Sequence, residues 1–140
     1  MPTTQAPGQA RQALLKAIDQ FNSWRFYDCH ETLEDVWLET GPKGDDATLA
    51  NYYQGLIKVA AGFHHILRDN HKGATTLLTD SLRLLSPYQP TTLGIDIAAL
   101  TAAVQSCLDR LTELGPNRIS DFDRSTIPTI EYNPNDLTPA

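Results

Sequence analysis

The chain has 140 residues, of which 41% are hydrophobic, and it carries a net charge of −6 with a pI near 5.0. This length and composition are sufficient for one domain with its own core, without metals or disulfides. The acidic balance and the scattered basic residues exclude nucleic acid and an anionic membrane as expected partners, because both select a basic surface.

The N-terminal residues and the two cysteines indicate a cytoplasmic protein. The first ten residues are polar, with proline and glycine, and no apolar stretch follows them as in a secretory leader. No apolar run has the length that spans a bilayer. No run of Lys or Arg lies beside Cys29 or Cys107 to lower a thiol pKa. We therefore expect two buried, reduced thiols rather than a disulfide or a reactive cysteine.

The first half of the chain predicts three helices. Residues 1–8 are expected to be a flexible lead, and a first helix starts at residue 9 and ends at a break near Asn22-Ser23. A second helix over about residues 25–39 ends before Gly41-Pro42. A third, over about 47–70, is apolar around most of its circumference and is expected to be central. Its Gly55 and Gly62 lie on one side, which indicates the close approach of another helix.

Two further helices are predicted over about residues 72–86 and 95–114, and Gly115-Pro116 ends the second of them. His71 is expected to be a loop residue. The tail, residues 117–140, contains short β-like stretches without a partner strand elsewhere in the chain. We expect this tail to lie extended over the bundle, anchored by Phe122, Ile127, Ile130 and Tyr132.

The predicted fold class is all-α, a compact bundle of about five helices. Short connections imply two antiparallel helical hairpins, followed by a C-terminal helix and the extended tail. The bundle is expected to be one domain over residues 9–116. A faint similarity relates the hairpins, because Cys29, Leu33 and Trp37 match Ala74, Leu78 and Leu82 at a constant offset.

The stretch DCHETLEDVW, residues 28–37, combines polar groups with an apolar stripe on the second helix. At about 100° per residue, His30 lies roughly 20° from Trp37, and Glu34 about 40° further round. Glu31 lies at the boundary of this face. A second set of groups is offered by the third helix, namely Tyr53, Gln54, His64 and His65.

Three interpretations of these residues stay open. His30, Glu34 and His64 could hold a divalent transition metal, although both the HExxH pattern and a second Glu-x-x-His are absent. The same groups could instead satisfy one another's hydrogen bonds as a buried polar cluster without any chemistry. In the third interpretation they bind a small ligand without a metal or any other cofactor.

Three segments carry a resemblance to a known family: FNSWRFYDCHETLEDVW, YYQGLIKVAAGFHH and NHKGATTLLTDSLRLL. They resemble the bacterial and archaeal domain-of-unknown-function family numbered 309, over roughly Phe21 to Leu85. The resemblance implies a small helical bundle and no established activity. The signature positions that it implies are His30, Glu31, Glu34, Trp37, Gln54, Gly55 and His64. Trp24 stands where members often have glycine, which argues against a tight left-handed turn there.

Two functions from different classes follow. The first is a binding or interaction module with a polar pocket between the second and third helices, formed by His30, Glu31, Glu34, Trp37, Tyr53, Gln54 and His64. Its partner would be a small ligand or a protein. The second is a metal-dependent hydrolase or oxidoreductase that uses His30, Glu31, Glu34 and His64. The acidic surface and the central glycines would also suit a homodimer.

Overall fold

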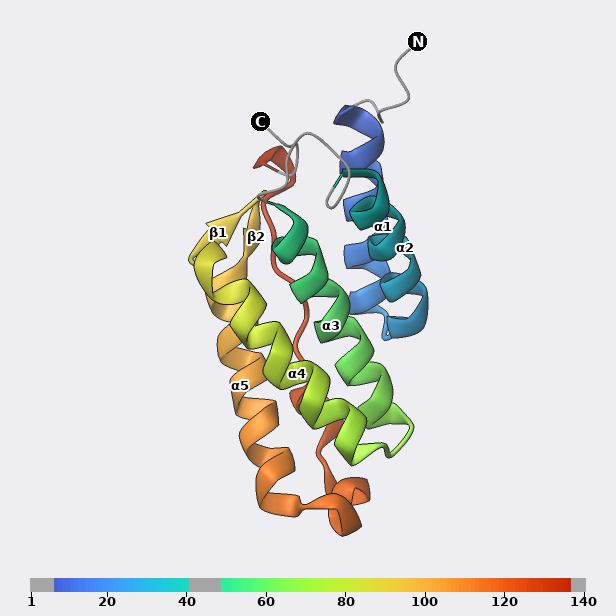
Figure 1. The fold of residues 1–140 in the computed structure, drawn as a ribbon, viewed down its shortest axis with the longest axis vertical. Helices are drawn as coiled ribbons and strands as arrows, with labels where there is room; N and C mark the ends of the chain where they lie inside the picture. Colours follow the sequence, from blue (N-terminus) through green and yellow to red (C-terminus); the bar gives the residue numbers. More distant parts are fainter. Residues whose placement is uncertain (1–6, 41–48, 137–140) are drawn as a thin grey trace.

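The computed structural model describes residues 7–40 and 49–136, which form a bundle of five α-helices (Figure 1). The helices are α1 (Pro7–Asn22), α2 (Phe26–Thr40), α3 (Ala50–Leu67), α4 (His71–Leu85) and α5 (Ile97–Leu114). Each helix packs against the next one along the chain, so α3 lies between α2 and α4. The predicted all-α class is confirmed. The division into lead, bundle and tail stays a prediction, and residues 1–6 lie outside the described part.

The two helical hairpins share one turn geometry. At the end of α1, Arg25 N–H donates to Gln20 O at 2.8 Å, and Trp24, at φ 63°, donates to Phe21 O at 3.0 Å. The end of α3 repeats this pair of bonds around Asp69, at φ 57°. Both are Schellman motifs, which place a left-handed residue just after the helix.

The expectation against a left-handed turn at Trp24 is therefore wrong. A residue other than glycine in this left-handed conformation costs roughly 1 kcal/mol of backbone strain. The indole of Trp24 stacks on Phe26 at a centroid distance of 6.4 Å. Trp24 and Asp69 are related by the same sequence offset that relates Leu33 to Leu78. The faint similarity between the hairpins thus extends to their turns.

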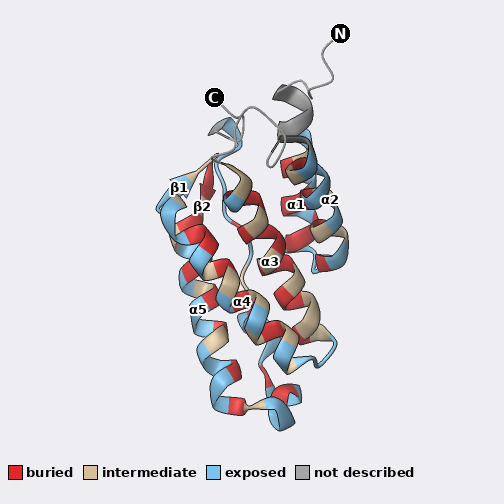
Figure 2. Ribbon diagram, viewed as in Figure 1, coloured by how far each residue is buried: buried red, intermediate tan, exposed pale blue. Residues whose placement is uncertain are grey.

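The centre of the bundle is aromatic where α1, α2 and α3 meet. Phe63 of α3 lies with its ring centroid 5.9 Å from that of Phe21 and 5.8 Å from that of Phe26. All three side chains are buried, and the inward faces of the helices around them are buried as well (Figure 2). Cys29 and Cys107 are also buried, as free thiols, and burial raises the pKa of Cys29 to about 12.

The glycines of α3 are covered by leucines of α4. A β-carbon added at Gly62 would lie 2.6 Å from Leu78 Cδ2, and one added at Gly55 would lie 2.6 Å from Leu85 Cδ2. The predicted close approach of another helix is therefore confirmed, and that helix is α4 of the same chain. These glycines consequently leave no open surface for a homodimer contact.

The connection from α4 to α5 contains a 3-10 turn (Ser86–Tyr88) and a small hairpin of β1 (Thr91–Thr92) and β2 (Ile95–Asp96). Beyond α5, the tail forms three 3-10 turns (Pro116–Asp121, Arg124–Thr126 and Pro134–Asp136). It runs along the bundle between α3 and α5 (Figure 1).

The tail does find a partner strand, which corrects the sequence prediction. Ile95 of β2 forms an antiparallel bridge with Tyr132. A strand of two residues has too little alternation to be recognised in a sequence. Of the predicted anchors, Phe122, Ile127 and Ile130 are buried, whereas Tyr132 is 39% exposed.

His71 is also more than a loop residue. It begins α4, after the N-cap Asn70, and its Nε2 lies 2.8 Å from the main-chain oxygen of Leu111 in α5. Because a carbonyl oxygen only accepts, Nε2 carries the proton and donates. His71 therefore links the start of α4 to the end of α5.

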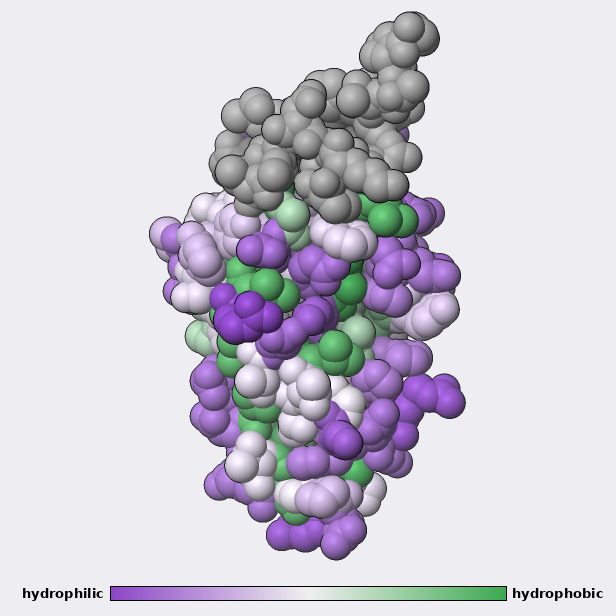
Figure 3. Space-filling model, in the orientation of Figure 1, coloured by the Kyte–Doolittle hydropathy of each residue, from purple (hydrophilic) through white to green (hydrophobic). Residues whose placement is uncertain are grey.

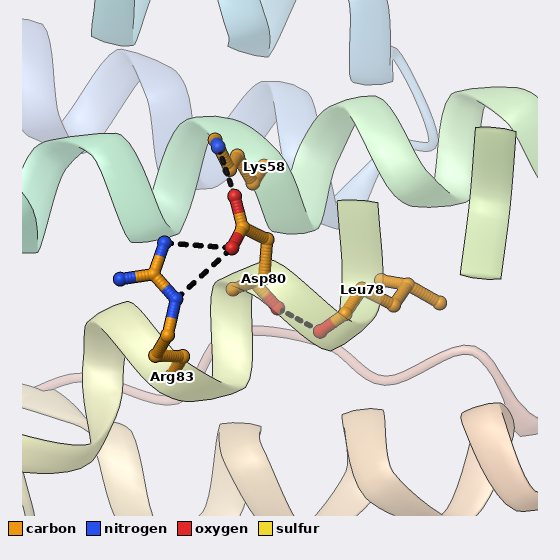
Figure 4. A network of polar contacts seen from close by, with 5 residues as sticks. Lys58, Leu78, Asp80 and Arg83 are labelled. Atoms are coloured by element: carbon orange, nitrogen blue, oxygen red, sulfur yellow. Dashed lines mark hydrogen bonds and ion pairs between the residues drawn. The ribbon is translucent and has the colours of Figure 1, made fainter. Parts of the chain in front are cut away.

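A polar network centred on Asp80 joins α3 to α4. Asp80 accepts hydrogen bonds from Lys58 of α3 through one oxygen and, at 2.7 Å, from Arg83 through the other (Figure 4). These two cations hold the pKa of Asp80 below its ordinary value of 3.8, and the Lys58 hydrogen bond is the larger cause.

Replacing Lys58 with Met should therefore raise the pKa of Asp80 more than replacing Arg83 with Gln does, as measured by NMR titration of the carboxyl carbon. A carboxyl whose pKa is lower in the folded chain stabilises the fold above the ordinary value, and this contribution disappears as the pH falls through the folded value. The Lys58→Met protein should accordingly lose less stability between pH 5 and pH 3, roughly the range in which Asp titrates. A larger rise for Arg83→Gln would contradict this ranking.

Candidate functional site

The candidate site lies where the first turns of α2 face the last turns of α3. The Tyr27 ring lies with its centroid 5.8 Å from that of His30 and 5.7 Å from that of His64. Together with Ala61 and His65, these residues line a hollow of about 240 Å³. The structure thus brings the predicted residues His30 and His64 to one place.

Helical spacing explains the arrangement. Tyr27 and His30 are three residues apart on α2, so they lie on the same face, one turn from each other. Ala61 and His64 have the same spacing on α3, and His65 follows at i+4 from Ala61. Because alanine is the smallest of these side chains, the space above it is left open to solvent.

The imidazole of His64 is disposed to be neutral. Its pKa is lowered from 6.5, first by burial and then by electrostatic interaction with His65, Arg68 and His30. A neutral imidazole has one donor and one acceptor nitrogen. His64 therefore offers the hollow one hydrogen-bond donor and one acceptor in its neutral form.

The tautomer of His65 follows from its neighbours. Asn70 Oδ1 accepts from Gly73 N–H at 3.0 Å as the N-cap of α4, so Asn70 Nδ2 is the atom that faces His65 Nδ1 at 3.1 Å. An amide nitrogen only donates, so His65 Nδ1 accepts and the ring proton lies on Nε2. His65 is thereby fixed in orientation by the same residue that caps α4.

The predicted carboxylates lie beside this hollow rather than inside it. Glu34 Oε2 is 3.5 Å from His30 Nε2, and the Glu34 side chain is 50% exposed. Glu31 and Glu34 also line a separate groove of about 460 Å³ between α1 and α2, together with Lys16 and Gln20. His30 therefore lines the hollow together with His64, and its contact with Glu34 also brings it to the edge of the groove between α1 and α2.

The remaining predicted residues lie elsewhere. Tyr53 is only 2% exposed and packs on Tyr52 with a centroid distance of 5.5 Å, so its ring belongs to the core. Trp37 is half-buried against the same core. Gln54 precedes His64 by nearly three helical turns, roughly 15 Å along the axis. The structure therefore does not bring Trp37, Tyr53 and Gln54 to the hollow.

A metal site at this place would need His30, Glu34 and His64 to gather around one point. Within residues 7–40 and 49–136, no three His, Cys, Asp or Glu side chains gather in a way that could hold a metal ion. His30 and Glu34 form a pair, and His64 lies across the hollow with Tyr27 between the rings. The proposed set of His30, Glu34 and His64 is not assembled as three ligands.

Sequence reasoning missed Tyr27 and Ala61. Tyr27 precedes His30 by one turn and is 54% exposed. The signal that could have found it is its position beside the apolar stripe of α2 rather than within it. Ala61 gave no signal of its own, because its role is to occupy little space.

A larger hollow of about 620 Å³ lies along α5, lined by Cys107, Arg110, Glu113, Asp123 and other residues. Size alone does not make it the better candidate for a ligand. Its charged side chains are exposed, and Arg110 is paired with Glu113 at 3.5 Å. Burial raises the pKa of the Cys107 thiol, which therefore stays protonated.

The fold and this surface define a small helical-bundle protein with a hollow of tyrosine and histidine between α2 and α3. No helix among the described residues has the length and apolar character needed to cross a membrane. Residues 14–77 match the family described as a domain of unknown function, DUF309. This match confirms, over residues 14–77, the resemblance to that family that the motifs indicated.

One relative is similar over more of the chain than the family match. The chain is 30% identical over 103 residues to the uncharacterised protein YpuF of Bacillus subtilis strain 168. The similar region covers 71% of this chain and 57% of YpuF, so the chain spans little more than half the length of that relative. The similarity extends beyond the DUF309 match and carries no activity with it.

Proposed function

We propose that this protein is a binding module whose contact site is the hollow lined by Tyr27, His30, Ala61, His64 and His65. The single observation that carries the proposal is the gathering of three imidazoles and an exposed tyrosine around an open space. Apolar ring faces and a few convergent polar groups are typical of binding sites. The group that it accepts is flat and largely apolar, with one hydrogen-bonding edge.

The size of the hollow supports a part of a partner as its occupant. Pockets that enclose a whole small ligand measure roughly 300–1,000 Å³, whereas this hollow measures about 240 Å³. One aromatic side chain of a partner protein, or one end of a ligand, suits it better. Polar residues cover most of the face that carries α4, where apolar residues show only in separate areas (Figure 3).

The metal-dependent alternative receives no comparable support. Catalysis by a bound metal needs a ligand set with an open position, and the described residues do not assemble three ligands. The His30–Glu34 pair is half-exposed and local to α2. The residues that line the hollow include no serine or cysteine that could act as a nucleophile, so this lining is better suited to contact than to nucleophilic catalysis.

A titration followed by ¹H–¹⁵N NMR tests this proposal, with N-acetyl-tryptophanamide as the probe. We expect saturable shift changes confined to the backbone amides of residues 27–30 and 61–65, with a Kd in the millimolar range, about 4 kcal/mol. The matched variants are Tyr27→Ala and Leu38→Ala, because both remove an exposed side chain from α2. Tyr27→Ala should abolish saturation and Leu38→Ala should preserve it.

A comparison probe, N-acetyl-alaninamide, has the same peptide groups without the ring and should cause no saturable change. Equal responses to the two probes would mean that the hollow does not recognise a flat apolar group. Shift changes centred away from residues 27–30 and 61–65 would place binding elsewhere on the protein. Either result would overturn the proposed site.

A further inference from the structure

Residues 122–134 form a segment that we call the C-terminal strap. It leaves the 3-10 turn after α5, passes the ends of α3 and α1, and reaches β2 (Figure 1). Apart from the 3-10 turn Arg124–Thr126, the start of another at Pro134 and a single β-bridge, it has no regular structure. Its position therefore depends on contacts with the bundle rather than on its own hydrogen bonds.

Several contacts bind main-chain groups of the strap. Because every peptide has these groups, another peptide could make the same contacts. The side chain of Asn22, in the last turn of α1, binds both polar groups of one residue. Its Nδ2 donates to Ile130 O at 3.2 Å, and its Oδ1 accepts from Ile130 N–H at 2.7 Å. An amide side chain in this position substitutes for the neighbouring strand of a sheet.

The segment around β2 continues the pairing in the form of strand addition. Asp96 N–H donates to Glu131 O at 3.0 Å, and Asn133 N–H donates to Gly94 O at 2.7 Å. Arg11 of α1 then donates to Pro134 O at 2.9 Å. The bundle thus binds the main chain of residues 130–134 from two sides.

The strap adds side-chain contacts at defined spacing. Ile127 and Ile130 are buried, whereas Thr129 and Glu131 between and after them are exposed. Pro128 and Pro134 fix their own φ and keep the residues before them, Ile127 and Asn133, out of the helical region, which lowers the entropy lost on binding. Buried anchors at fixed positions of a preorganised extended segment are the features of a bound peptide.

The groove is wider than the strap that lies in it. Where the strap begins, the hollow of about 620 Å³ between it and α5 has Cys107, Asp123 and Thr126 in its lining. Cys107 Sγ lies 3.6 Å from Thr126 O, so the strap touches this hollow through its main chain. Space for larger side chains is therefore available beside the strap.

We propose that the groove formed by α1, α5 and β2 is a peptide-binding site, and that the strap is its occupant in the same chain. The ligand is an extended segment of a partner protein with the pattern Ile-Pro-x-Ile-x-aromatic. It binds through the same main-chain contacts after displacing the strap. This site uses residues other than those of the Tyr27–His64 hollow, so the two proposals stand independently.

The experiment separates the strap from the bundle while keeping the full chain. A specific protease site is inserted between Asn117 and Arg118, which are exposed, and the folded protein is cut there. A fluorescein-labelled peptide with the sequence of residues 118–140 is then added, and anisotropy follows its exchange with the cut segment. We expect a saturable exchange, with the helical circular dichroism unchanged.

Two matched comparisons address Asn22. Replacing Asn22 with Ala should raise the Kd of the peptide about tenfold, since two hydrogen bonds are lost, whereas Asn51→Ala on the exposed side of α3 should leave it unchanged. If Asn22→Ala impairs folding, the peptide carries the same test. N-methylation at Ile130 removes the N–H group that donates to Asn22 and should weaken binding, whereas N-methylation at the exposed Thr129 should not.

Three outcomes would overturn the proposal. One is loss of the helical signal when the cut segment is exchanged away, because the strap would then be part of the core. Another is a cut protein that stays folded and never takes up the labelled peptide. The third is equal affinity for a peptide of scrambled sequence, which would leave no recognition of the isoleucine pattern.

Discussion

Replacing Phe63 with Ala should lower the free energy of unfolding by about 4 kcal/mol, as measured by urea denaturation at neutral pH. Truncating a buried phenylalanine costs about 3–5 kcal/mol, because apolar surface and packing contacts are lost together. Phe63 is fully buried and contacts the rings of Phe21 and Phe26. Each aromatic pair adds about 1 kcal/mol beyond burial, so the site falls toward the upper half of that range.

The matched control for Phe63 is Tyr27, which carries a ring of similar size on the surface. Since Tyr27 is 54% exposed, Tyr27→Ala should change the free energy of unfolding by less than about 0.5 kcal/mol. Phe63→Leu keeps most of the volume and should cost about 1.5 kcal/mol or less. Similar losses for Phe63→Ala and Tyr27→Ala would mean that the three-ring cluster is not the centre of stability.

The helices were predictable because each one buries a stripe whose period is visible in the sequence. Leu33 and Leu78 are buried at matching positions of the two hairpins, and the nearly all-apolar residues of α3 marked it as central. The turns were less accessible, since the Schellman geometry at Trp24 overrides the usual preference for glycine. The β2 contact with Tyr132 joins residues distant in sequence and has no local signal.

The site was predictable only in part, for a geometric reason. His30 and His64 could be placed on facing sides of α2 and α3 by helical spacing alone. Their positions along the helix axes depend on how far one helix is shifted along the other, and periodicity does not define that shift. That register places His64 beside Tyr27 and leaves Gln54 nearly three turns away. It also separates Glu31 from the histidines, because the boundary of a helical face can turn toward either neighbour.

Replacing Gly62 with Leu should lower the free energy of unfolding by about 2 kcal/mol. A β-carbon at this position would lie 2.6 Å from Leu78 Cδ2 and 2.7 Å from Leu78 Cγ, and Leu78 is fully buried. Overpacking costs about 1–3 kcal/mol and occasionally more. A leucine adds further atoms beyond this β-carbon, so we expect a cost at the upper end of that range. The gain of about 1 kcal/mol from removing a helical glycine offsets part of the cost.

The exchange of the two side chains tests the cause of that loss. Leu78→Ala alone should cost about 3 kcal/mol, because it leaves a cavity between α3 and α4. In the double variant, the new leucine at position 62 enters the space that Leu78 vacates, so the combined loss should be smaller than the sum by about 2 kcal/mol. Gly55→Leu combined with Leu78→Ala is the control, since Gly55 faces Leu85 and Leu84 instead. Additive losses in the first pair would show that α3 and α4 separate on substitution, and that the glycine does not determine how closely they pack.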